Sequence, residues 1–149
     1  MKGALAAVLL GVWTASFANL CQAQTWSGDS IVNPLTATPG DAVKGRVIVA
    51  SRQTGLCLLC HSGPFPEERF QGNLAPEIGL SVGRLSEAQL RARMVDPSRF
   101  NPGTIMPSYY RSVGFNRIAP KFEGQPILSG QEIEDVLAFL VSLKAVVAQ

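Results

Sequence analysis

Histidine and cysteine are scarce in this chain of 149 residues, which contains one histidine, His61, and three cysteines. With a single imidazole, the chain cannot bind a metal ion between two of its own histidines. Cys21 lies in the N-terminal segment, so only Cys57 and Cys60 remain further along the chain. A disulfide framework needs well-separated cysteine pairs. This sequence offers none.

The chain also lacks a strong excess of charge. Thirteen basic and eleven acidic residues give a net charge of +2, which provides no strong attraction to nucleic acid or anionic membrane. No apolar run beyond the N-terminus is long enough to cross a bilayer. The length suits one domain and is too short for two of ordinary size. We therefore expect no nucleic-acid partner and no membrane insertion of the mature protein.

The N-terminus has the pattern of a secretory signal. Lys2 is followed by an apolar run from Gly3 to Leu20 and then by Cys21-Gln22-Ala23, which predicts a signal peptide over residues 1–23 with cleavage after Ala23. Polar residues interrupt the run and disfavour a retained membrane anchor, and Asn19-Leu20 disfavours a lipid-anchored Cys21. Export would place the mature protein in the periplasm, an oxidising compartment.

The rest of the chain is predicted to be all-α, with three main helices and no convincing strand. Residues 24–40 form an irregular leader, and residues 41–149 form the domain. Asp41 can cap a helix to about Arg52, whose apolar face would carry Val43, Val47 and Ala50.

Two capping-box patterns mark the other helices. One starts at Ser86 and its helix must stop near Asp96, before Pro97. The other starts at Ser129 and opens a closing helix with an apolar stripe formed by Ile133, Val136, Leu137, Leu140 and Leu143. The long Pro- and Gly-rich loops between the helices are unusual unless something other than protein fills the core.

Cys57-Leu58-Leu59-Cys60-His61 is the haem-attachment pattern C-x-x-C-H. Two thiols one helical turn apart can reach both vinyl groups along one porphyrin edge, and the next residue can ligate the iron. A thioredoxin-like pair does not need the histidine. A zinc site would need two ligands besides the cysteines, and apart from His61 the mature chain has no other Cys or His. The pattern predicts one covalent haem c with His61 as an axial ligand, which leaves no imidazole for a catalytic pair.

The other axial ligand must come from elsewhere in the chain. Methionine is a common partner of histidine in cytochromes c, and the mature chain has two, Met94 and Met106. We expect Met106, which precedes Pro107 in a loop, whereas Met94 fits a core position in a helix. A ligating histidine usually donates its other ring N–H to a fixed acceptor. We expect the carbonyl of Pro76 to be that acceptor; the alternative is an ordinary loop proline.

An attachment motif near the first helix, a Met-Pro loop and an amphipathic last helix look like a class I cytochrome c. Segments 63–76, 84–91, 101–110 and 116–120 more specifically resemble the SoxX family, the monohaem subunits of the SoxAX complex of periplasmic sulfur oxidation. The resemblance covers about Gly40 to Lys144. It implies His/Met ligation of the haem, which corresponds to His61 and Met106 in this sequence.

The resemblance also implies a role. SoxAX joins thiosulfate oxidatively to a cysteine of the carrier SoxYZ. The catalytic haem belongs to SoxA, and SoxX passes the electrons to another cytochrome c. This chain would then be a non-catalytic electron-transfer subunit in a heterodimer with a SoxA-like cytochrome. The residues agree, because a mature chain whose two cysteines are both bonded to haem has no free thiol to carry a sulfur intermediate.

Two other hypotheses are a free-standing periplasmic electron shuttle, and a protein whose haem is structural or binds a ligand at an open sixth site. Basic residues gather in the second half of the chain and could face an anionic partner or thiosulfate. We expect them instead to be solvated surface charges. They are Arg91, Arg93, Arg99, Arg111, Arg117 and Lys121.

Overall fold

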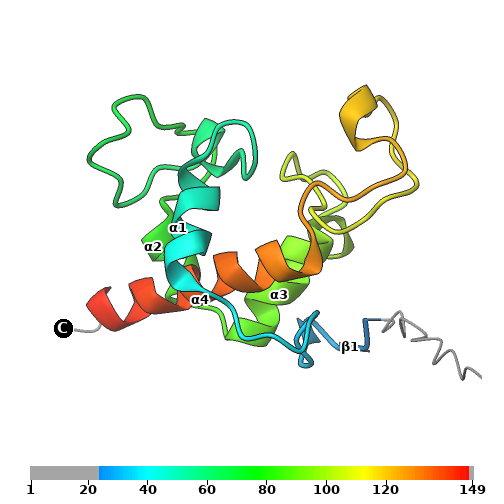
Figure 1. Cartoon of the computed structure of the whole chain (residues 1–149), viewed down its shortest axis with the longest axis horizontal. Coiled ribbons are helices and arrows are strands. Elements are labelled where there is room, and N and C mark those ends of the chain that lie inside the picture. Colours follow the sequence, from blue (N-terminus) through cyan, green and yellow to red (C-terminus); the bar gives the residue numbers. More distant parts are fainter. Residues whose placement is uncertain (1–23, 148–149) are drawn as a thin grey trace, which may run out of the picture.

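A computed structural model describes residues 24–147, so the signal peptide expected over residues 1–23 lies outside the described part. The protein is helical with very little strand, and its long loops extend from the helices (Figure 1). The elements in chain order are β1 (Trp26–Ser27), β2 (Ser30–Ile31), α1 (Ala42–Ala50), the 3₁₀ turn η1 (Cys57–Leu59), α2 (Ile78–Val82), α3 (Glu87–Val95), the 3₁₀ turns η2 (Pro97–Arg99) and η3 (Pro120–Phe122), and α4 (Gly130–Val147). Among the described helices, none is long and apolar enough to span a membrane.

Helix α1 crosses α4 at a glycine. The side chain of Asp41 caps α1 by accepting hydrogen bonds from two backbone N–H groups of its first turn. A Cβ atom on Gly45 would lie 1.9 Å from the carbonyl oxygen of Asp135 in α4, so only glycine permits this approach. The predicted apolar face of α1 is therefore wrong. Val43 and Val47 are exposed, whereas Gly45 and Val49 are buried.

The two capping boxes are present where they were predicted. Ser86 and Gln89 exchange hydrogen bonds at the start of α3, and Ser129 and Glu132 do the same before α4. Helix α3 ends at Val95, ahead of Pro97.

Two elements were not expected from the sequence. The five-residue helix α2 lies in a segment predicted as loop, and the side chain of Glu77 caps it. In the leader, β1 and β2 pair as a minimal antiparallel hairpin in which Trp26 faces Ile31. Both elements are too short to show a hydrophobic period.

Arg91 joins the leader to the helices. Its guanidinium donates to both carboxylate oxygens of Glu134 in α4, at 2.8 and 2.9 Å, and to the carbonyl oxygen of Ile31 at 3.0 Å. Glu134 in turn accepts the backbone N–H of Leu35. Burial disfavours the charged guanidinium, but the hydrogen bonds and charges of Glu134 and Glu87 outweigh it and raise the pKa of Arg91. The expectation that Arg91 is a solvated surface charge is wrong, since its side chain is 2% exposed.

Breaking this pair should destabilise the protein strongly. Arg91→Met would leave the Glu134 carboxylate buried without its counter-ion, and we expect the free energy of unfolding to fall by about 3–5 kcal/mol. Guanidinium denaturation of the haem-loaded protein would measure this, with the exposed Arg99→Met as the matched control. Adding Glu134→Leu to Arg91→Met should restore part of the loss, because no unpaired charge then remains buried. A loss below about 1 kcal/mol in the single variant would contradict this account.

Candidate haem-binding site

The attachment motif follows a tight turn after α1. A Cβ on Gly55 would lie 2.2 Å from the carbonyl oxygen of Ile48, so the chain can fold back on α1 only with glycine there. Leu56 then adopts a left-handed conformation with φ of 61°, and η1 begins at Cys57. The N–H groups of Cys60 and His61 both donate to the carbonyl oxygen of Cys57, at 3.1 and 2.9 Å. The motif is thus wound into one helical turn, as two thioether bonds to one porphyrin edge require.

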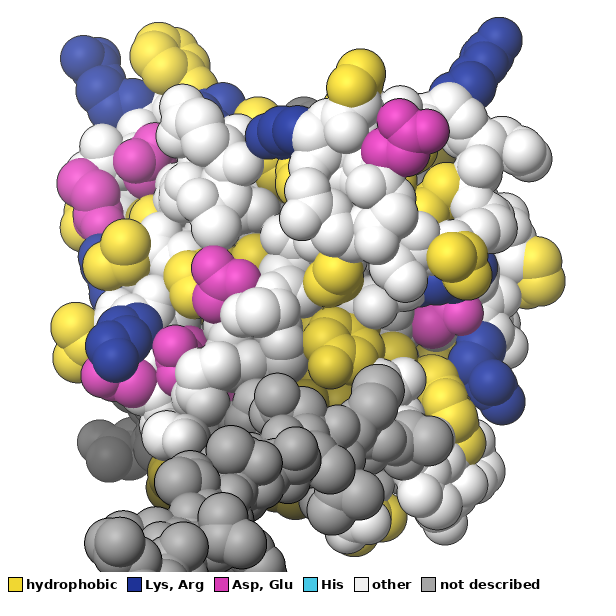
Figure 2. All heavy atoms as spheres, turned by 45° about the vertical axis from the view of Figure 1, so that its right-hand side comes forward, with side chains coloured by type: hydrophobic (Ala, Val, Ile, Leu, Met, Phe, Trp, Pro, Cys, Tyr) yellow, Lys and Arg dark blue, Asp and Glu magenta, His cyan; other side chains and the backbone are white. Residues whose placement is uncertain are grey.

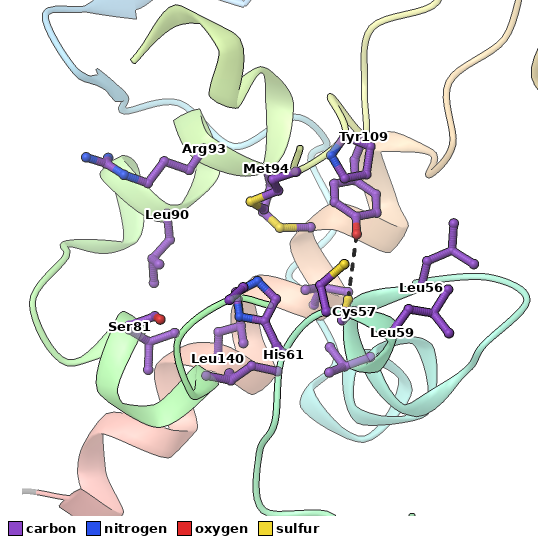
Figure 3. A pocket seen from close by; sticks show the side chains of 18 of the residues that line it. Leu56, Cys57, Leu59, His61, Ser81, Leu90, Arg93, Met94, Tyr109 and Leu140 are labelled. Carbon is purple, nitrogen blue, oxygen red and sulfur yellow. Dashed lines mark hydrogen bonds between the residues drawn. The ribbon is translucent and has the colours of Figure 1, made fainter. Parts of the chain in front are cut away.

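The motif opens onto a cavity of about 490 Å³ that is lined almost entirely by apolar side chains. Its walls come from α1, η1, α2, α3, the loop around Met106 and α4. In Figure 3, His61 and Met94 point into this space from different elements, and Cys57 and Leu59 lie along one side of it. A cavity of this size in the middle of a small helical domain falls within the range of cofactor sites.

Cys57 is a partly buried, neutral thiol. Burial raises the pKa of Cys57 to about 11, against a weaker lowering by the hydroxyl of Tyr109. Both Cys57 and Cys60 are free thiols in the described part of the chain. Redox-active C-x-x-C pairs instead depend on a lowered thiol pKa. The environment of Cys57 therefore disfavours a thioredoxin-like role.

Tyr109 lines the cavity, whereas the sequence alone leaves open whether this aromatic residue walls a cofactor or packs at an interface. Its hydroxyl donates to the carbonyl oxygen of Gly55 at 2.8 Å and lies 3.9 Å from the sulfur of Cys57 (Figure 3). Tyr109 is buried, and its backbone N–H donates to the carbonyl oxygen of Met94. It thereby ties the loop that follows Met106 to both α3 and the turn before Cys57. Tyr109 is 52 residues from Cys57, and no sequence pattern marks the contact.

The ring of His61 is oriented by the carbonyl of Pro76. The Nδ1 atom of His61 lies 2.6 Å from this oxygen. A carbonyl oxygen can only accept, so Nδ1 carries the proton and Nε2 keeps a free lone pair. Backbone hydrogen bonds from Ala75 to Cys60 and from Ile78 to Ser62 hold the Pro76 loop against the motif. This is the arrangement that a metal-ligating imidazole needs.

Both methionines of the described chain line the cavity. Met94 projects from α3 and is 5% exposed, with its side chain packed in the core. Met106 lies in the loop after α3, where its N–H donates to the hydroxyl oxygen of Thr104 and Pro107 follows. The structure thus brings together all the predicted site residues: Cys57, Cys60, His61 and Met106 in the cavity wall, and Pro76 behind His61.

These residues fit a haem c. The cavity offers two unpaired thiols one helical turn apart, an imidazole with one nitrogen free and one fixed, and two thioether sulfurs. Apart from these groups the walls are nearly all hydrocarbon, which suits the faces of a porphyrin. No three His, Cys, Asp or Glu side chains within residues 24–147 gather as they would around a metal ion.

The basic residues of the second half do not form one surface. Arg91 is buried, and Arg111 lies 3.7 Å from a carboxylate oxygen of Asp96. Arg93 and Arg99 stack on aromatic rings. On the face shown in Figure 2, Lys and Arg side chains stand apart from one another with Asp and Glu between them. Three members of the set are exposed, as predicted for solvated charge: Arg99, Arg117 and Lys121. Arg91 is buried, and Arg93 and Arg111 are only partly exposed.

Comparison with known proteins identifies a relative. No protein-family model and no curated protein sequence matches the chain. Among solved structures, the crystal structure of SoxXA from P. pantotrophus contains a similar chain, with 35% sequence identity and a TM-score of 0.73. The match covers 80% of this chain and 93% of that one. A sequence identity of 35% over nearly the whole relative indicates a family relationship and not only a shared fold. This chain belongs to the SoxX family of cytochrome subunits.

Proposed function

We propose that this protein is the monohaem electron-transfer subunit of a periplasmic SoxAX complex, with a class I cytochrome c fold. The observation that carries the proposal is the convergence of Cys57, Cys60, His61 and Met106 on one apolar cavity. The similarity to a SoxXA chain supports a SoxA-like cytochrome as the partner.

Cys57 and Cys60 would attach one haem c through two thioether bonds. When bound, the haem supplies an iron that alternates between the ferric and ferrous states. The chain's own residues would keep the iron in an apolar environment and orient its histidine ligand. The apolar walls exclude water, and the carbonyl of Pro76 holds the Nδ1–H of His61 so that Nε2 faces the cavity. A hydrogen-bonded imidazole is a better electron donor to a metal.

Met106 is the proposed second axial ligand. Its loop is tied at both ends: Thr104 donates to the carbonyl oxygen of Asn101, and Tyr109 donates to that of Met94. Met106 itself is partly exposed and is not locked within a helix. Met94 has its backbone fixed within α3 and its side chain in the core cluster. A thioether ligand favours ferrous iron and raises the reduction potential.

Sulfur chemistry would belong to the partner. Within residues 24–147 the only cysteines are Cys57 and Cys60, both used for attachment in this proposal. The only histidine, His61, uses its Nδ1 atom for the hydrogen bond to Pro76, and its Nε2 atom faces the cavity. We therefore assign to a SoxA-like subunit the joining of thiosulfate to a SoxYZ cysteine, which releases two electrons. This chain would pass those electrons to an acceptor cytochrome c.

Removing both thiols should prevent haem attachment and leave the core of the protein unfilled. Cys57→Ala with Cys60→Ala should yield a haem-free and largely unfolded chain, because the cavity of about 490 Å³ would then have no filling. Circular dichroism and thermal melting would test this, with Val43→Ala, an exposed change outside the cavity, as the control. Native-like helicity and cooperative melting in the double variant would show that the haem is not needed for folding.

Met106 should account for the sulfur–iron signal. Met106→Ala should abolish the weak far-red charge-transfer band of the ferric protein and lower its reduction potential, whereas Met94→Leu should leave the band in place. Absorption spectroscopy and redox titration give both readings. The opposite pattern would assign the ligand to Met94, and ready binding of carbon monoxide by the unaltered ferrous protein would point to an open sixth site.

The isolated chain should not conjugate thiosulfate. Mixed with a SoxA-like partner, the carrier and an oxidised acceptor cytochrome, it should accelerate formation of the carrier adduct, measured by mass spectrometry. Met106→Ala should slow this turnover and leave thiosulfate binding by the partner unchanged. Conjugation by the isolated chain would refute the division of roles. A lack of stimulation or co-purification would favour a free-standing electron shuttle.

A further inference from the structure

Arg93 is the one strongly charged side chain in the cavity wall. Among the described residues that line the cavity, it is the only Lys, Arg, Asp or Glu. Arg93 is half-buried and is the single such charge at the edge of an otherwise apolar cavity. This makes Arg93 informative about the group that fills the space.

Most N–H donors of the Arg93 guanidinium have no acceptor within residues 24–147. The guanidinium donates to the carbonyl oxygen of Gln89 at a long distance of 3.3 Å, and its carbon lies 4.6 Å from the centre of the Phe100 ring. No ion pair to Arg93 occurs within residues 24–147. The neighbouring carboxylate of Asp29 is already held by the side chains of Gln89 and Ser30. Arginine carries five N–H donors in a planar fork that fits a carboxylate.

Arg93 also lies at a particular end of the cavity. Figure 3 shows Arg93, Leu90 and Ser81 on one side, and Cys57, Leu56 and Leu59 on the opposite side. In a haem, the two propionate carboxylates stand on the edge opposite the vinyl groups. Thioether bonds on the Cys57 side therefore direct the propionates toward the Arg93 side.

Other donors at this end are already occupied. The hydroxyl of Ser81 donates to the carbonyl oxygen of Glu77 at 3.0 Å. The ammonium of Lys144 donates to the carbonyl oxygen of Leu85, another residue of the cavity wall. Among the described residues of the cavity wall, Arg93 remains as the cation available to an anionic group.

We propose that Arg93 is the counter-ion of a haem propionate and raises the reduction potential of the haem by compensating the propionate charge. The inference depends on the proposed haem attachment but not on the sulfur chemistry. The ring of Phe100 holds the guanidinium end of Arg93 by cation–π stacking. Loss of the positive charge would favour the ferric state, which carries one more positive charge than the ferrous state.

The test uses haem-loaded Arg93→Gln, with Arg99→Gln as the matched control. Arg99 stacks on Trp26 and does not line the cavity, so its removal changes the net charge equally. We expect Arg93→Gln to shift the one-electron reduction equilibrium about tenfold toward the ferric form, which is about 59 mV. Arg99→Gln should shift it less than twofold. The propionate bending mode in resonance Raman spectra should move in Arg93→Gln and stay unchanged in Arg99→Gln.

Arg93→Lys keeps the positive charge and removes the planar guanidinium, so it separates the effect of the charge from that of the hydrogen-bond geometry. It also provides a second variant in case Arg93→Gln fails to fold. It should retain most of the potential, because the charge remains, while the propionate mode moves because the two-pronged hydrogen bonding is lost. Retention of haem after acidic organic extraction is measured first for each protein. Unaltered protein without covalent haem would refute the proposed function. Covalently loaded Arg93→Gln with an unchanged propionate mode, or with a potential shift equal to that of Arg99→Gln, would overturn the role of Arg93.

Discussion

The close crossing of α1 on α4 is the constraint on which the site depends. Gly45 lets the two backbones approach until no side chain fits between them. The crossing fixes the position of α1 and of its last residue, Ala50. It therefore also fixes the position in which the turn through Gly55 places Cys57. The same crossing sets Val49 and Val136 in the wall of the cavity. A wider crossing would displace the attachment motif from the loop that carries Met106.

The site combines a rigid side and a more adaptable side. On the His61 side, the motif is wound into one turn and the Pro76 carbonyl fixes the imidazole. On the methionine side, a loop crosses the cavity and is held by Tyr109, whose hydroxyl reaches the turn before Cys57. Tyr109 thus couples the two sides through Gly55. In the proposed function, these contacts would hold His61 and Met106 at a fixed separation on the two sides of the cavity.

Features encoded locally could be predicted from the sequence. The capping boxes at Ser86 and Ser129 are four-residue patterns, and both helices begin there. The C-x-x-C-H motif needs only five consecutive residues. The proximity of His61 and Pro76 could be anticipated because the intervening loop is short and rich in proline and glycine.

Features that depend on residues far away in the sequence could not be predicted from it. The buried face of α1 follows from Gly45 meeting Asp135, and periodicity alone favoured Val43 and Val47 because they are larger apolar residues. Arg91 appeared to be one of many surface cations, since its partner Glu134 is 43 residues away. Tyr109 carries no motif. In each case a residue's environment is set by a segment that lies far away in the sequence.

The anchoring of the leader has a consequence for the order of events during biogenesis. Leu35 bonds to Glu134 and Asp41 to Asp135, at separations of 99 and 94 residues. Neither contact can form until the last helix has been synthesised, and contacts so distant in sequence form slowly. Because synthesis starts at the N-terminus, the segment that holds Cys57 and Cys60 is complete well before α4 can close the fold over it. Both thiols therefore stay accessible until α4 packs against α1.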